Sequence, residues 1–213
     1  MKGLLVKDLI ILKRSLKTMA AVTVIFIIAG WADKSNGMLI SLAFIFSMMT
    51  MSSFSYDQFS NWETYALTAP ISLRQYVTSK YLLSGLLSLV GMLLVLVTLV
   101  AKLFINQLFD AQLIFLFGGV ALLGSFLLSI LTLPLLFKFS IEKARLAVMS
   151  LVAIFFLLIS TVGYLFEKSQ VTILNQFSSF SVNHLILILF VTTLGLCAIS
   201  YPLSYRFFKQ KFN

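Results

Sequence analysis

The sequence is divided into long runs that contain no Asp, Glu, Lys or Arg. Most of these runs have at least about 20 residues, the length that an α-helix needs to cross the hydrocarbon core of a bilayer. Only 11% of the 213 residues are charged, whereas soluble domains carry about 25%. Most of the surface is therefore expected to face lipid. The runs lie at residues 18–32, 35–56, 81–101, 111–137, 146–166 and 169–205.

Each run predicts one transmembrane helix. The first run is short, but Leu16 extends it and Lys17 can reach back towards the headgroups. The last run begins with a polar stretch, Ser169–Asn183, so its span is expected to begin at Leu185. Strands are excluded because the runs are too long and lack alternation. We therefore predict one all-α, polytopic domain over residues 1–213, with six spans at about 18–32, 37–55, 81–103, 111–136, 146–166 and 185–205.

The distribution of Lys and Arg predicts the orientation of these helices. With the N-terminus placed inside the cell, only Lys34, Lys102 and Lys168 fall outside. Loops that carry most of the Lys and Arg are typically cytoplasmic, and this, rather than nucleic-acid binding, explains the net charge of +9. We predict a multi-pass cell-membrane protein with both termini in the cytoplasm. The inside residues are Lys2, Lys7, Lys13, Arg14, Lys17, Arg74, Lys80, Lys138, Lys143, Arg145, Arg206, Lys209 and Lys211.

Residues 1–17 are predicted to form an amphipathic helix in the cytoplasmic interface. At 100° per residue its cations share an arc of about 140°, with leucines and isoleucines on the other side and Asp8 interrupting the apolar face. The alternative is an ordinary basic flank of the first span. The cations, expected near anionic headgroups, are Lys2, Lys7, Lys13, Arg14 and Lys17.

The cytoplasmic loop at residues 56–80 is predicted to contain a helix, a break and a second helix. Ser60 or Asn61 can cap the first helix, Pro70 would end it, and Ser72 can cap the second. The aromatic side chains of this loop have two interpretations that the residues do not separate. They form either a handle for another protein or part of the aromatic belt at the membrane surface.

No motif for catalysis, nucleotide binding or metal binding occurs in the sequence. It has no G-x-x-x-x-G-K-[ST], no G-x-S-x-G and no H-E-x-x-H, and it has a single cysteine, Cys197, and a single histidine, His184. We therefore predict no catalytic residue, cofactor or metal ligand in this chain. All seven acidic residues are expected in or near loops, so a proton-driven carrier lacks the buried ionisable groups it would need.

Three segments resemble the membrane subunit of ATP-binding-cassette transporters of the type-2 (ABC-2) permease family, and together they extend over nearly the whole chain. The first is Met1–Leu9, which resembles the family's N-terminal interfacial helix. The second is Asn61–Tyr65 with Ala69–Ser72 and Val77–Tyr81, which resembles the first cytoplasmic loop. The third is Lys138–Arg145, which resembles the second loop. Gln58, Leu73 and Ser140 depart from the family's usual residues.

The resemblance implies six spans, a separate ATPase subunit that binds ATP and Mg, and a second, identical or related, permease chain. It also implies that the loop helix couples to the ATPase through Ser60, Asn61, Trp62, Glu63, Tyr65, Leu67 and Pro70, with Glu142, Lys143 and Arg145 in the second cytoplasmic loop. Within the family the chain is similar to small permeases that export amphipathic or antimicrobial peptides, including the phenol-soluble modulin exporters of Gram-positive bacteria. The alternatives are a membrane-embedded enzyme and a stand-alone immunity protein that binds a toxin.

Overall fold

The computed structural model describes residues 2–32, 36–68, 71–107, 110–150 and 182–212. Within these ranges the chain is helical apart from short turns. Residues 141–150 form a further helical segment after α6. The remaining helices are α1 Lys2–Lys13, α2 Leu16–Ala32, α3 Gly37–Phe59, α4 Trp62–Thr68, α5 Leu73–Ile105, α6 Ala111–Lys138 and α9 Val182–Phe212.

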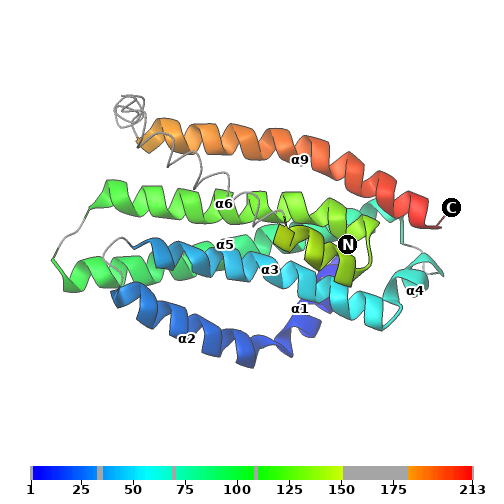
Figure 1. The fold of residues 1–213 in the computed structure, drawn as a ribbon, viewed down its shortest axis with the longest axis horizontal. Coiled ribbons are helices and arrows are strands. Elements are labelled where there is room, and N and C mark those ends of the chain that lie inside the picture. The colour runs from blue at the N-terminus through cyan, green and yellow to red at the C-terminus, as the bar shows by residue number, and fades with distance from the viewer. Residues whose placement is uncertain (1, 33–35, 69–70, 108–109, 151–181, 213) are drawn as a thin grey trace.

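The long helices form a bundle whose axes run along the molecule, with the short helices α1 and α4 at one end (Figure 1). Helices α3, α5 and α6 pack against one another, α9 lies on α6, and α2 lies on the outside against α3. The C-terminus of α9 reaches the same end as α1 and α4 (Figure 1). We call this the charged end, because the thirteen Lys and Arg predicted to be cytoplasmic lie on the segments that meet or end there.

Four helices are long and apolar enough to cross a membrane, namely α3, α5, α6 and α9. Helices α1 and α2 pass the same test only as a pair bent by 68°, which gives up to five candidate spans among the described residues. The predicted total of six is therefore not shown. The predicted span at 146–166 lies mostly outside the described residues, with only its first residues in the helical segment 141–150.

Small side chains allow α3 and α5 to approach closely. A Cβ atom on Gly91 of α5 would lie 2.7 Å from the Cα of Ala43 on α3. One turn along α3, the hydroxyl of Ser47 donates to the carbonyl of Ser125 on α6 at 2.7 Å and lies 2.6 Å from the hydroxyl of Ser129. Close backbone contact and hydroxyl pairing are the interactions that hold helices together where no water is present.

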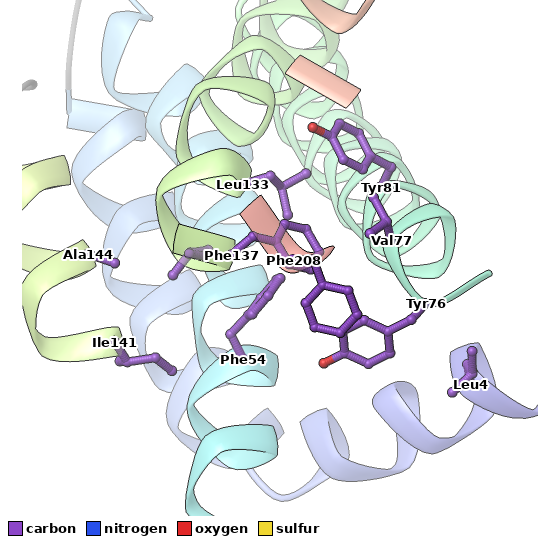
Figure 2. Packing of buried hydrophobic residues seen from close by; sticks show 11 residues of the cluster. Leu4, Phe54, Tyr76, Val77, Tyr81, Leu133, Phe137, Ile141, Ala144 and Phe208 are labelled. Atoms are coloured by element: carbon purple, nitrogen blue, oxygen red, sulfur yellow. The ribbon is translucent and has the colours of Figure 1, made fainter. Parts of the chain in front are cut away.

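An aromatic cluster closes the bundle at the charged end. The ring of Phe208 on α9 stacks on Tyr76 of α5 with 4.9 Å between centroids, and it meets Phe137 of α6 edge-on at 5.4 Å. Phe54 of α3 packs edge-on against Phe137 at 5.0 Å. Figure 2 shows these rings together, with Leu4 of α1 on the side of Tyr76. All four long helices therefore share one buried contact next to α1 and α4.

The ends of two long helices are capped as their sequences suggest. Ser72 forms a capping box with Gln75 at the start of α5, which confirms the predicted role of Ser72. The carboxylate of Asp110 accepts from the backbone N–H groups of Gln112 and Leu113 at the start of α6. Because α3 continues to Phe59 and α5 begins at Leu73, the connection between them is shorter than the predicted loop at residues 56–80.

Candidate functional site

Helix α4 has an inner face that is anchored to the rest of the chain. Trp62 packs against the aromatic cluster, and the Nζ of Lys7 on α1 lies 4.6 Å from the centre of its ring. Glu63 is buried and forms an ion pair with Lys211 near the end of α9. Ala66 is also buried. Helix α4 is therefore held between α1 and α9.

The outer face of α4 carries large exposed aromatic side chains. The side chain of Tyr65 is 62% exposed, and that of Phe59, at the end of α3, is 87% exposed. Between them Ser60 and Asn61 are also exposed. Asn61 adopts a left-handed backbone conformation with φ of 49°, and its carbonyl accepts from the N–H of Tyr65. Phe59 and Tyr65 are therefore exposed on either side of this turn.

The residues predicted to couple to an ATPase are thus divided between the two faces. Ser60, Asn61 and Tyr65 are exposed, whereas Trp62 is partly buried and Glu63 is buried. Pro70 and the side chain of Leu67 lie outside the described residues. None of these observations tests the coupling role itself, which stays a prediction.

A network of three buried charges and one partly buried charge lies on the helices next to α4. The Nζ of Lys80 on α5 is 3.1 Å from both carboxylate oxygens of Asp8 on α1 and 2.6 Å from Asp57 on α3. The Nζ of Lys7 is 2.5 Å from Asp57 and 3.0 Å from Asp8. We call these residues, Lys7, Asp8, Asp57 and Lys80, the charge network. Two positive and two negative charges make it formally neutral.

The polar neighbours of the charge network complete its hydrogen bonding. Lys80 donates to the hydroxyl of Ser53 at 2.7 Å, and the hydroxyl of Tyr76 donates to Asp57 at 2.9 Å. Asp8, Asp57 and Lys80 are at most 1% exposed. Charges buried to this degree persist only when they are paired and hydrogen-bonded. The network therefore fixes α1, α3 and α5 to one another at the charged end.

The structure corrects the sequence interpretation of two of these charges. Asp57 was expected in a loop and Lys80 at the end of one, but both lie within helices that continue past them. Asp8 breaks the apolar face of α1 because it points into the bundle, on a buried stripe with Leu4 and Leu12. Asp57 lies four residues after Ser53, and Lys80 four residues after Tyr76, so each shares a helix face with a buried residue. This spacing could have predicted that both charges are buried.

The cations predicted for the N-terminal helix differ in their exposure. Lys2, Lys13, Arg14 and Lys17 are exposed, while Lys7 is turned towards Asp57 and Trp62. Exposed apolar residues Val6 and Ile10 accompany the exposed cations on α1. Nothing in the structure tests contact with a membrane surface, so the interfacial role of this helix stays a prediction.

The second loop lies next to the first. Glu142, Lys143 and Arg145 are exposed, while the neighbouring Ile141 and Ala144 are buried in the aromatic cluster. The backbone N–H of Ile141 donates to the side chain of Gln58 at 3.0 Å. This hydrogen bond joins the two segments at the charged end. Among the described residues no three His, Cys, Asp or Glu side chains are grouped as metal ligands.

Residues 3–209 match the model of a protein family described as "ABC-2 family transporter protein". The chain belongs to the ABC-2 transporter family. No curated protein and no solved structure gives a match. This ABC-2 protein is the membrane component of a transporter. The membrane domain of such transporters lacks ATPase motifs and acts with ATPase subunits, as the sequence resemblance implied.

Proposed function

We propose that this ABC-2 protein is a permease chain that exports amphipathic peptides with energy from an ATPase subunit docked on the outer face of α4. Two such chains, identical or related, would enclose the path, and the ATPase would bind ATP and Mg. The exposed aromatic pair Phe59 and Tyr65 carries the docking proposal. A large apolar side chain that is exposed on a short surface helix is an anchor that a pocket in a partner can bury.

The charge distribution supports the orientation that docking requires. The charged end contains α1, α4, the end of α9 and the second loop, and thirteen of the sixteen Lys and Arg lie on the segments that meet or end there. Such an excess is typical of the cytoplasmic side of a membrane protein, where the ATPase and its ATP are found. We therefore place the charged end in the cytoplasm and the exposed cations of α1 near anionic headgroups.

The proposal assigns different roles to the two faces of α4. Phe59, Ser60, Asn61 and Tyr65 would touch the ATPase, together with Glu142, Lys143 and Arg145 of the neighbouring loop. Trp62 and Glu63 would hold α4 in place through Lys7 and Lys211. Replacing either anchor would weaken docking by changing the position of α4 and not by removing a contact with the partner.

Purification of the full chain from its own membranes in mild detergent tests the docking proposal. An ATPase subunit should be recovered with the unchanged chain, and Phe59→Ala combined with Tyr65→Ala should lower its recovery by about tenfold or more, as expected when a pair of central aromatic anchors is removed. Phe104→Ala is the matched control, because Phe104 is 78% exposed near the opposite end of α5. Equal recovery from all three chains would reject α4 as the docking site.

The cargo is tested in vesicles that contain the purified complex. A fluorescent amphipathic helical peptide should accumulate when ATP is added, whereas a polar peptide of the same length should not. Accumulation of both peptides, or of neither, would reject the peptide cargo while leaving the docking result unaffected. The second permease chain is tested by chemical cross-linking of the complex in these vesicles, where a product containing two permease chains is expected.

A further inference from the structure

The charge network is the part of this chain that neither the family match nor the sequence assigns. Its members come from three helices, α1, α3 and α5. Lys80 belongs to α5, Asp57 to α3, and Lys7 and Asp8 to α1. The same Lys7 that pairs with Asp57 also lies over the ring of Trp62 on α4. One cation therefore connects the network to the inner face of α4.

Lys80 has the central position in this network. Its Nζ contacts Asp8, Asp57 and Ser53, and it is fully buried. Its Nζ also lies 5.0 Å from the ring centre of Phe54 and 5.5 Å from that of Tyr76. If the ammonium group were lost, Asp8 and Asp57 would be left buried with Lys7 alone, and the network would carry a net negative charge. That state is strongly unfavourable in a buried site.

We propose that Lys80 is a positioning residue for α4: its charge balances Asp8 and Asp57, and this balance keeps α1 in the bundle and Lys7 against Trp62. The order of contacts is Lys80 to Asp8, then along α1 to Lys7, then to Trp62. Lys80 itself need not touch anything that binds to α4. This placement of α4 within the chain does not depend on whether an ATPase docks there.

Cysteine labelling of the full chain in inside-out membrane vesicles tests this order of contacts. Cys197, the only cysteine, is first replaced by Ser. Reporter cysteines then replace Leu4 on α1, Ala66 on α4 or Ala144 in the segment 141–150, one at a time. All three side chains are at most 6% exposed, so a membrane-impermeant maleimide should react slowly with each.

Lys80→Met should raise the labelling rate of the reporters at Leu4 and Ala66 by about tenfold, because local opening sets the reaction rate of a buried thiol. The labelling rate of the reporter at Ala144 should not change. Ala144 packs in the same buried cluster as Leu4, but it belongs to neither α1 nor α4. Lys102→Met is the matched control. Lys102 lies near the other end of α5 and donates to the carbonyl of Gly30, so its loss should leave the reporters at Leu4 and Ala66 unchanged.

A second variant separates the effect of an unbalanced charge from the effect of losing the Lys80 side chain. Asp8→Asn with Lys80→Met removes one charge of each sign and leaves the pair Lys7 and Asp57. Labelling of the reporter at Ala66 should then return towards the slow rate of the background chain. If Lys80→Met alone fails to insert, Asp8→Asn alone takes its place, with the same direction expected and a smaller increase.

Three outcomes would overturn the proposal. Faster labelling at Leu4 without a change at Ala66 would show that α4 does not depend on α1. Equal increases at Leu4, Ala66 and Ala144 would show that Lys80 supports the whole bundle and has no specific role for α4. Rates in the double variant as fast as in Lys80→Met would show that an unbalanced charge is not the cause.

Discussion

The side-chain Oε1 of Gln58 accepts a hydrogen bond from the backbone N–H of Ile141, at 3.0 Å and across 83 residues of sequence. Ile141 is the first residue of the helical segment 141–150, and the first N–H groups of a helix have no partner within it. Gln58, near the end of α3, therefore acts as a cap supplied by another helix. It joins the first loop to the second.

Gln58→Met should lower the free energy of unfolding by about 1 kcal/mol, the usual effect of losing a helix cap. Methionine has nearly the same shape but cannot accept this hydrogen bond. The change is measured as a lower thermal transition in detergent. Gln112→Met serves as the control because Gln112 is exposed near the start of α6. Equal transition temperatures for the two variants would contradict the assigned role of Gln58.

Gly91→Ala should destabilise the pairing of α3 and α5. The added methyl would lie 2.7 Å from the Cα of Ala43, and because that atom is backbone, one of the helices must move. Such overpacking costs about 1–3 kcal/mol, more than the roughly 1 kcal/mol that alanine gains over glycine in a helix. The expected result is a lower thermal transition.

Gly85→Ala is the matched control for this substitution. It lies on the same helix, and its added methyl would meet only a ring carbon of Phe126 at 3.6 Å, an ordinary contact. The gain in helix propensity should therefore dominate and leave stability unchanged or slightly higher. A Gly91→Ala chain that is as stable as Gly85→Ala would show that α3 and α5 separate without cost.

Tyr81→Phe should loosen the contact between α5 and α9. The hydroxyl of Tyr81 lies 2.6 Å from that of Ser200 and 2.9 Å from that of Ser204. Hydrogen bonds between membrane helices contribute about 0.6–1.7 kcal/mol each, so the thermal transition should fall measurably. Tyr56→Phe, at an exposed position on α3, should have no effect. Equal thermal transitions for the two variants would show that the hydroxyl cluster does not stabilise the contact between α5 and α9.

Glu63→Gln should weaken the attachment of α4 to α9 only slightly. Its partner Lys211 remains partly exposed, and pairs of this kind contribute about 0.2–1 kcal/mol. The reporter cysteine at Ala66 described above should therefore be labelled less than tenfold faster. The difference should shrink at high salt, which screens exposed charges. A salt-independent effect of tenfold or more would show that this pair, and not Lys7, is the main anchor of α4.

The sequence alone predicted those parts of the fold that depend on local patterns. Uncharged runs located α3, α6 and α9, and Ser72 indicated the start of α5. The charge network was missed because charges were used to mark the ends of spans. Asp57 and Lys80 do lie at such ends, but their pairing joins residues far apart in the chain. No local pattern shows that a carboxylate on one helix will meet an ammonium group on another.

The candidate site was predicted in position but not in orientation. The sequence placed a short aromatic helix between two long ones, and α4 is there. Which face of a seven-residue helix is turned inward depends on what its neighbours offer. Here Lys7 contacts Trp62 and Lys211 pairs with Glu63, so these two side chains face inward. Tyr65 is exposed on the other face.

The charge network also sets an order for the making of this protein. A ribosome completes Lys7, Asp8 and Asp57 before it reaches Lys80, so a nascent chain that stops short of residue 80 holds only two aspartates and one lysine of the charge network. Without Lys80, these charges would be unbalanced in a buried site. We therefore expect the N-terminal helix to dock only after the start of α5 has emerged, as a late step of biogenesis although it is synthesised first.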